Sequence, residues 1–576
     1  MDTRLKKSLL APCVLAAVVA AVLALTGAFL LFELQAPHYL VNGAPFAYRL
    51  EHIAAALGAG WRSSNCGVGL LNWFNLDCRL QAIGQLWADG LIKTRVLAVL
   101  AAALVGAAIA FFVSARFCSR RERFATLTSE RPVYDGEARA SVRAAIAAFG
   151  DAARGLWLLP GVQLSPTVEA MNILAVGAQG SGKTLYLRGL LEQILRLNRR
   201  TVIRDAKGDM LSTLPVPLNQ MILLAAHDDR SWVWDIAADI SNGLAAAEVA
   251  RRFVRNTGTS ESFWVNSAQA IFAALVMHLH HTKGPHWSWQ DLYKALMMPA
   301  AELKLALDVT APAVALLIEI DAEGSIDRTS HGVLMTLWTA CFATVEPLAK
   351  AFAAVPAERR FSIVAWLSAK SRLPRTIVLQ RSSEYPELSE AVDGLFIDML
   401  ARFLASPRMP SRRTPWVSLV LDELPTLGKL EHFADMLSVS REKGLTTIAA
   451  VQDLDQLETL YGKSAANTIL DKFGIKAVCR VPVSATRERI SKDWGGERTV
   501  SVRTLDLRPD QPLTKEKVVP VVSPSVLTEL GVVGAGTRKY VCLMIFGLGN
   551  PAIVRVAATI WRPRRAAHKP AAWLSQ

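Results

Sequence analysis

The chain is poor in cysteine, in charged residues and in acidic residues relative to basic ones. It has 7 cysteines in 576 residues and no CxxC pair, which excludes a disulfide scaffold and gives no sign of a zinc or iron–sulfur site. Only 20% of the residues are charged, 52% are hydrophobic and the mean hydropathy is +0.27, so a disordered chain is excluded. The net charge of +14 favours an acidic partner such as nucleic acid or anionic lipid.

Two apolar runs near the N-terminus account for the high hydropathy. Residues 8–32 and 96–115 contain no charged residue, and each provides the about 20 residues that a membrane-spanning helix needs. Basic residues precede the first run and follow the second, whereas the segment from Glu33 to Ile92 has only three arginines and four acids. The positive-inside rule therefore predicts cytoplasmic termini and an external loop at 33–95. A cleaved signal peptide is the alternative for the first run, but its apolar core exceeds the usual ~7–15 residues.

Two of the cysteines, Cys66 and Cys78, fall in the expected external loop. A disulfide between them is allowed if that loop faces an oxidising compartment, and two reduced thiols fit the sequence equally well.

A complete phosphate-binding motif follows an apolar run at 171–176 and precedes a helical pattern at 184–195. Residues 177–184 read GAQGSGKT and match G-x-x-x-x-G-K-[ST] in full. In this motif backbone N–H groups cradle phosphate oxygens, the lysine reaches the β and γ phosphates, and the hydroxyl binds Mg²⁺. The predicted nucleotide-binding residues are Gly177, Ala178, Gln179, Gly180, Ser181, Gly182, Lys183 and Thr184, of which Thr184 is also a metal ligand.

A second apolar run, at 417–421, ends in the paired acids Asp422 and Glu423. In a nucleoside triphosphatase, acids at the end of a neighbouring buried strand hold Mg²⁺ through water and polarise the attacking water. We assign the first role to Asp422 and the second to Glu423. No LSGGQ-like signature and no HRD or DFG set is present, which argues against a transporter ATPase and a protein kinase.

Two residues beyond the acidic pair are candidates for contact with the γ-phosphate. Gln452 ends the strand expected at 446–452, where ring NTPases can place a sensor, and Arg441 lies on the preceding helix, where a finger toward a neighbouring subunit can lie. From spacing alone, an ordinary strand-end residue and a solvated helix terminus explain these two residues equally well.

The spacing also predicts how the chain divides. Lys183 and Asp422 are 239 residues apart, whereas a bare P-loop core needs about a hundred there, so an inserted domain is expected between them. Its helical character follows from apolar residues at three- and four-residue spacing. The expected divisions are a transmembrane region at 1–115, a basic linker and helical stretch at 116–165, a nucleotide-binding domain at 166–239 and 351–560, an inserted all-α domain at 240–350 and a short basic tail at 561–576.

Taken together, these segments resemble the conjugative coupling proteins of type IV secretion, the TraD/TrwB group. The resemblance covers about 170–560 and rests on GAQGSGKT, DAKGD at 205–209, FSIVAWL at 361–367, DELPTLGKLEHFADMLSVSREKGL at 422–445 and AAVQDLDQLETLYG at 449–462. It implies an α/β fold: a RecA-like P-loop core with an inserted all-α domain and two N-terminal transmembrane helices. The core strands are expected at 171–176, 201–205, 220–225, 376–380, 417–422, 446–452 and 475–481.

The resemblance also implies a function and site roles. It implies an inner-membrane homo-hexamer that uses ATP and Mg²⁺ to recruit relaxase-bound DNA to a secretion channel and to pump DNA. By motif position Arg441 is the arginine finger, Gln452 the sensor and Glu423 the catalytic acid, while Asp205 and Gly208 support the site. The implied partners are DNA, relaxase and relaxosome proteins, type IV secretion channel subunits and the lipid bilayer.

Two other functions stay open at this point. One is an ATP-gated docking platform that recruits protein substrates and moves no DNA, and the other is a chromosome pump of the FtsK/HerA type. No helix-turn-helix, zinc-finger or RRM signature occurs, so DNA binding should be largely independent of sequence. Basic residues such as Arg251, Arg252 and Arg255 are candidates for DNA contact, although each alone is more often part of a solvated face. The basic tail at 561–576 is expected to contact DNA or no partner.

Overall fold

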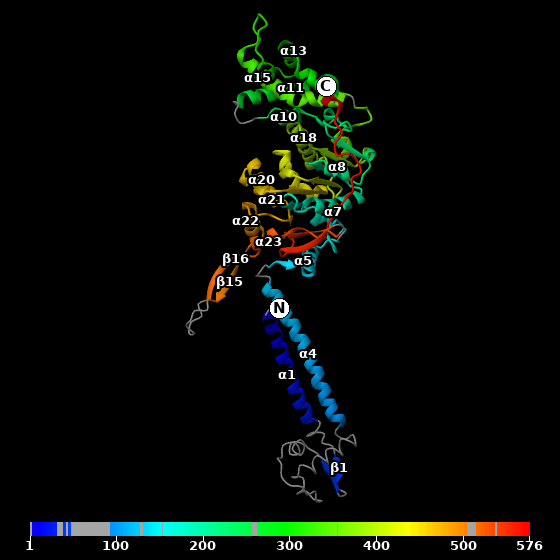
Figure 1. The fold of residues 1–576 in the computed structure, drawn as a ribbon, viewed down its shortest axis with the longest axis vertical. Coiled ribbons are helices and arrows are strands. Elements are labelled where there is room, and N and C mark those ends of the chain that lie inside the picture. Colours follow the sequence, from blue (N-terminus) through cyan, green and yellow to red (C-terminus); the bar gives the residue numbers. More distant parts are fainter. Residues whose placement is uncertain are drawn as a thin grey trace. The chain divides into compact units, whose positions relative to one another are not determined.

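The protein, described here from a computed structural model, divides into two compact units, residues 1–129 and 130–576 (Figure 1). The structure describes residues 3–30, 38–41, 44–47, 93–126, 131–152, 154–255, 262–353, 355–503, 514–535 and 538–575.

The described residues of the first unit form a helix pair and a short hairpin. Helices α1 (Thr3–Phe29) and α4 (Lys93–Thr126) pack together, and the end of the Leu23 side chain of α1 lies against Gly106 of α4, 2.0 Å from where a Cβ would stand. Strands β1 (His38–Val41) and β2 (Ala44–Ala47) pair antiparallel in the segment between the helices. Cys66 and Cys78 lie outside the described residues, so their disulfide stays a prediction.

Among the described residues, two helical stretches are long and apolar enough to cross a membrane, Lys93–Val113 and Ser262–His286, and Ala16–Phe29 is a shorter apolar helix. The first and third coincide with the two predicted runs. The stretch at 262–286 is half buried inside the second unit and includes α11 (Ser262–Lys283), whose Ile271, Phe272 and Leu275 are buried. Its apolar character therefore belongs to a protein core.

The second unit is built on an eleven-stranded sheet whose central part is parallel. Every strand of this central parallel part except β14 is buried along its whole length, which explains why these segments are continuously apolar in sequence. The expected α/β class and core strands are confirmed, with ends displaced by at most three residues. In sheet order the strands are β14 (Ile475–Val478), β6 (Ile173–Val176), β13 (Leu445–Val451), β12 (Val417–Leu421), β7 (Arg200–Asp205), β11 (Thr376–Gln380) and β8 (Met221–Leu224).

The order of these strands determines where the predicted site residues meet. Val451 of β13 pairs with Val176 of β6, and Leu421 of β12 pairs with Ala449 of β13, all in parallel register. Parallel strands present their carboxyl ends at one edge of the sheet. The loop after β6 and the residues after β12 and β13 therefore lie together at that edge.

The sheet is extended at one side by strands that the sequence reasoning did not predict. Strands β17 (Gly531–Val533), β18 (Tyr540–Phe546) and β19 (Ala552–Ala557) pair antiparallel beyond β14, and β3 (Val133–Tyr134) completes that side. A separate antiparallel hairpin, β15 (Glu497–Arg503) and β16 (Thr514–Pro520), projects from this unit (Figure 1).

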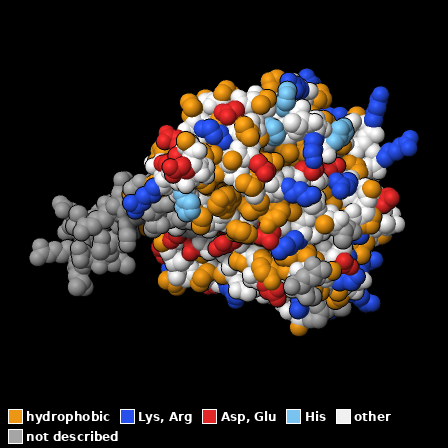
Figure 2. Space-filling view, turned by 90° about the horizontal axis from the view of Figure 1, so that it is seen from above, with side chains coloured by type: hydrophobic (Ala, Val, Ile, Leu, Met, Phe, Trp, Pro, Cys, Tyr) orange, Lys and Arg blue, Asp and Glu red, His pale blue; other side chains and the backbone are white. Residues whose placement is uncertain are grey.

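Helices fill the segment between β8 and β11. They are α10 (Gly243–Phe253), α11, α12 (Trp289–Leu296), α13 (Ala300–Thr310), α14 (Pro312–Ala315), α15 (Arg328–Ala343) and α16 (Val345–Ala353), and we call them the helical insert. The chain leaves through β9 (Val233–Trp234) and returns through β10 (Arg360–Phe361), which pairs parallel with β9. The predicted limits of 240 and 350 for this domain stay a prediction. Figure 2 shows basic, acidic and hydrophobic side chains interspersed on the face at this end of the molecule.

The end of the chain is tied to the second unit. From β19 it runs along the unit to helix α16 of the helical insert (Figure 1), and the Trp573 indole donates to the carbonyl of Ala226, in the segment after β8, at 2.7 Å. Lys569 forms an ion pair with Asp229 at 2.6 Å, and the Arg188 guanidinium lies over the Trp561 ring. The expected basic tail is therefore engaged in contacts with its own chain, because it carries aromatic and apolar residues as well as charge.

Candidate nucleotide-binding site

The loop at 177–184 connects β6 to α7 (Lys183–Arg196) and turns through three glycines with positive φ, +156° at Gly177, +72° at Gly180 and +102° at Gly182. A Cβ at Gly182 would lie 2.9 Å from Val541, so the loop packs closely on β18. Helix α7 begins without a side-chain cap and without an acidic residue in its first turn. Its N-terminal N–H groups are thus suited to an anion.

A cavity of about 150 Å³ lies at the carboxyl edge of the sheet, where the predicted residues converge. Of the predicted loop residues, Gly177 and Ser181 do not line it; the Ser181 side chain is buried behind it. The lining residues are Ala178, Gln179, Gly180, Gly182, Lys183, Thr184, Leu185, Lys207, Asp422, Glu423, Gln452 and Val532.

Two hydrogen bonds join the phosphate loop and the sensor to the acidic pair. The Thr184 hydroxyl donates to Asp422 Oδ1 at 3.2 Å, and Gln452 Nε2 donates to Glu423 Oε2 at 2.6 Å. The second oxygen of Glu423, Oε1, is buried and has no hydrogen-bond partner. Burial raises the pKa of both carboxyl groups, and the pKa of Asp422 is raised further by the charge of Asp209.

Lys183 is held by the loop that precedes it. Its ammonium donates to the carbonyls of Gly177 and Ala178, the latter at 3.1 Å. Burial lowers the pKa of Lys183, while the carboxylates of Glu423 and Asp422 act in the opposite direction. The side chain of Lys183 is therefore a desolvated cation at the N-terminus of α7, next to the carboxylates of Asp422 and Glu423.

Arg441 is not part of this pocket. It lies on α19 (Phe433–Lys443), two residues before the helix ends at Lys443, and its side chain is exposed. The structure brings Gln452 to Glu423 but leaves Arg441 on the surface of the unit.

One residue of the pocket, Lys207, was not singled out from the sequence. It belongs to the turn after β7, in which the buried Asp205 carboxylate accepts from the N–H groups of Lys207, Gly208 and Leu211 at 3.3, 2.8 and 2.7 Å. Gly208 has φ of +79°, which completes the turn, and Asp209 pairs with Arg188 of α7 at 3.3 Å. Burial raises the pKa of Asp205 to about 6. The signal was present: this lysine follows a strand that neighbours the one ending in Asp422.

Comparison with known proteins identifies the family. The type IV secretion-system coupling protein DNA-binding domain matches residues 157–508. The chain belongs to this family. The resemblance expected from the motifs is thereby confirmed.

Individual relatives agree with this assignment. Coupling protein TraD of Escherichia coli K12 is 22% identical over 318 residues, a match that covers 54% of this chain and 42% of TraD. The unbound conjugative coupling protein TrwB lacking its first 70 residues superposes with a TM-score of 0.60, at 22% identity, over 76% of this chain and 96% of that one. TrwB in complex with ADP and Mg²⁺ gives a TM-score of 0.58 at 22% identity, over 77% and 96%. These likenesses confirm the expected fold, a RecA-like P-loop core with an α domain.

Proposed function

We propose that this coupling-protein family member is an ATP-driven motor that recruits relaxase-bound DNA to a type IV secretion channel and pumps it during conjugation. The observation that carries this proposal is the convergence of Lys183, Thr184, Asp422, Glu423 and Gln452 on one pocket. A complete hydrolytic site favours a protein that turns over ATP, and stimulation of that turnover by DNA separates the motor from the ATP-gated docking platform.

The residues present fit ATP with Mg²⁺. The Thr184 hydroxyl and the Asp422 carboxylate, 3.2 Å apart, are the hard oxygen ligands that Mg²⁺ prefers, and they stand beside the phosphate loop. TrwB, the structural relative, has been solved with ADP and Mg²⁺. Thr184 and Asp422 would hold the Mg²⁺, which when bound would offset the negative charge of the phosphates.

The chain's own residues would divide the remaining work. Lys183 would exchange its carbonyl partners for phosphate oxygens, and Lys207 would add a second cation on the side of β7. Glu423 would orient the attacking water through its unpartnered Oε1, while the Gln452 amide fixes the other oxygen. Burial raises the pKa of Glu423, which brings this base closer to the pH at which it works.

To act as an arginine finger, Arg441 would need the nucleotide pocket of a second copy of the chain. Its exposed guanidinium lies outside the pocket of its own subunit, as expected of a finger that offsets transition-state charge in a neighbour. We therefore propose a homo-hexameric ring. The apolar stretches of α1 and α4 would anchor it in the inner membrane with both termini in the cytoplasm.

The proposed partners follow from charge and family. A net charge of +14 suits DNA bound through its phosphates without strong sequence preference. Relaxase and relaxosome proteins would deliver that DNA, and the secretion channel subunits would receive it.

The deciding experiment measures ATP hydrolysis by the full-length protein in lipid nanodiscs, with and without single-stranded DNA, while mass is monitored in the same samples. We expect DNA-stimulated turnover in the oligomeric fraction that both Lys183→Ala and Arg441→Ala abolish. Arg328→Ala, an exposed arginine on the helical insert, serves as the matched control. Turnover indifferent to DNA in a confirmed oligomer would overturn the motor and favour the platform for protein substrates.

A further inference from the structure

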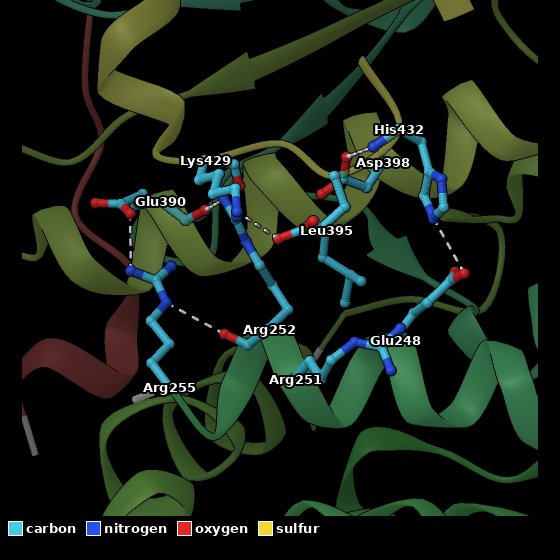
Figure 3. A pocket seen from close by; sticks show the side chains of 10 residues that line it. Glu248, Arg251, Arg252, Arg255, Glu390, Leu395, Asp398, Lys429 and His432 are labelled. Atoms are coloured by element: carbon cyan, nitrogen blue, oxygen red, sulfur yellow. Dashed lines mark hydrogen bonds and ion pairs between the residues drawn. The ribbon is translucent and has the colours of Figure 1, made fainter. Parts of the chain in front are cut away.

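Arg252 of the helical insert reaches into a pocket against the segment that follows the acidic pair (Figure 3). The cavity, about 300 Å³, lies between α10, α18 (Pro386–Ala405) and residues 429–432. The sequence made Arg252 a candidate for contact with DNA. The structure instead directs its guanidinium toward the protein.

The partners of this guanidinium are three main-chain carbonyls from two elements. Its Nη1 donates to Lys429 at 2.6 Å, and its Nη2 donates to Glu390 at 2.7 Å and also to Leu427. A planar guanidinium can serve three acceptors at once, whereas a lysine ammonium on a flexible stem cannot reproduce that fork. Arg252 thus joins α10 to α18 and to the segment 427–429.

The backbone around Arg252 is shaped to admit it. A Cβ on Gly394 of α18 would lie only 1.5 Å from Arg252 Nη2, so the guanidinium occupies the space where any other residue would carry its side chain. The neighbouring arginine, Arg255, has an acidic partner, Glu390, at 2.8 Å. Arg255 also donates to the Arg252 carbonyl at 3.2 Å, whereas all the hydrogen bonds of the Arg252 guanidinium go to main-chain carbonyls of other elements.

The segment 427–429, whose carbonyls bind Arg252, follows closely after Glu423, the proposed catalytic base. Leu427 ends the short helix η5 (Leu424–Leu427) that begins next to Glu423. The Thr426 hydroxyl donates to the Glu423 carbonyl at 2.8 Å and accepts from the buried Arg204 at 2.7 Å. A shift of the backbone at Glu423 that η5 transmits moves the carbonyls of Leu427 and Lys429, and this movement must either carry Arg252 with it or break its bonds to them.

We propose that Arg252 is a positioning residue that couples the segment after Glu423 to the helical insert. Movement of that segment on nucleotide binding is passed through the guanidinium to α10. This proposal rests on the proposed nucleotide site. It adds the contact through which nucleotide binding at that site would move the helical insert.

The test is hydrogen exchange in the full-length protein with and without a non-hydrolysable ATP analogue and Mg²⁺. In the wild type we expect the analogue to change exchange in both 424–432 and 243–253. In Arg252→Lys we expect the response of 424–432 to remain, the response of 243–253 to be lost, and the Kd of the analogue to stay within about threefold. The kcat for ATP should fall roughly tenfold or more with little change in KM, since misplacement of a catalytic segment by about 1 Å is costly.

Gly394→Ala tests the same contact while leaving Arg252 itself unsubstituted. Its new Cβ must displace the guanidinium, so this variant should reproduce the loss of the α10 response. In Arg252→Ala with Gly394→Ala the two effects should not add, because the methyl group then fills free space. Arg328→Lys and Gly136→Ala are the matched controls, since Arg328 is exposed and a Cβ on Gly136 has nothing within 4 Å.

Three results would overturn the coupling: a wild type whose α10 does not respond although the analogue binds, an unchanged α10 response in Arg252→Lys, and additive effects of the two substitutions. An analogue that fails to bind the wild type would overturn the nucleotide site itself, and the coupling with it. The Kd, measured in every variant, separates these cases.

Discussion

The nucleotide pocket and the Arg252 pocket lie along the same segment, 422–432, but they treat their carboxylates differently. In the nucleotide pocket the side-chain partners of Asp422 and Glu423 are neutral, the Thr184 hydroxyl and the Gln452 amide. In the Arg252 pocket two acids pair with cations, Glu390 with Arg255 at 2.8 Å and Glu248 with Arg402 at 3.1 Å, whereas the buried Asp398 accepts from a backbone N–H at 3.2 Å.

Buried acids with only neutral partners are costly to hold ionised. In the nucleotide pocket the charge of Lys183 offsets part of that cost, and the two acids stay available for a metal ion or a proton. In the Arg252 pocket the ion pairs of Glu390 and Glu248 connect the end of α10 to α18, which is a structural role. The first pocket is therefore expected to respond to substitution in its chemistry, and the second in coupling and stability.

The largest expected effect is the loss of ATP turnover when the proposed base, Glu423, is replaced. Glu423→Gln keeps the shape and one hydrogen-bond acceptor but removes the proton acceptor, so turnover should fall on the order of 10²–10⁴-fold. Nucleotide affinity should stay near that of the wild type, because phosphate is held by Lys183 and the loop. Turnover and the Kd for ATP with Mg²⁺ are the measurements. The control is Glu431→Gln, the same change at an exposed acid of the other pocket; similar losses in both variants would erase the distinction between the pockets.

The second prediction concerns the buried ion pair between the two pockets. Arg204 and Asp393 are 3.3 Å apart with side chains 0% and 3% exposed, and Arg204 also donates to Thr426. Asp393→Asn leaves a buried guanidinium without its counter-charge, which should lower the free energy of unfolding by about 3 kcal/mol.

Thermal unfolding of the full-length protein measures this loss. Glu346→Gln, which breaks the ion pair with Lys350 on α16, is the control and should leave the Tm unchanged. An Asp393→Asn variant as stable as this control would show that the pair between the pockets contributes nothing to their support.

How far the sequence predicts these two pockets differs for a physical reason. The nucleotide pocket is built from residues at the ends of buried parallel strands, and such strands are recognisable as apolar runs followed by motif residues. The antiparallel strands at the side of the sheet, such as β17 and β19, are only partly buried and show no such run.

The Arg252 pocket depends on distant segments. Arg252 binds the carbonyl of Leu427, 175 residues away, and a backbone carbonyl leaves no trace in the identity of its residue. Three arginines on or next to α10 looked alike in sequence, and only the tertiary fold decides which one turns inward. Lys207 lies between these extremes, because its motif was recognised while the turn that directs it to the pocket was not.

The third prediction tests Lys207 as a second phosphate-side cation. Lys207→Ala should raise the KM for ATP roughly tenfold, since a hydrogen bond to a charged group contributes about 1.5–3 kcal/mol. Lys207→Arg should restore part of the affinity. Lys429→Ala is the matched control in the other pocket, where the carbonyl of that residue, not its ammonium, contacts Arg252. Equal KM values for Lys207→Ala and the wild type would remove Lys207 from the site.

The smallest effect concerns the pH dependence of the Arg252 pocket. The hydrogen bond from His432 to Glu248, 3.1 Å, raises the pKa of that imidazole, and burial raises the pKa of Asp398 to about 6. Both groups bind protons more tightly in the folded state, so their stabilising contribution is present at low pH and is lost as pH rises, through about 6 for Asp398 and above 6.5 for His432.

His432→Gln should therefore flatten the decline of Tm above pH 6.5 by roughly 1–2 °C. The decline below about pH 6 should persist, because it belongs to Asp398, whose carboxylate keeps the backbone N–H of residue 432 as a donor at 3.2 Å. Melting curves across this range, for the wild type and the variant, provide the measurement. An identical slope of Tm above pH 6.5 in both proteins would assign the pH dependence to groups outside the pocket. The contact of α10 with residues 427–432 would then depend on Arg252 and its carbonyl partners alone.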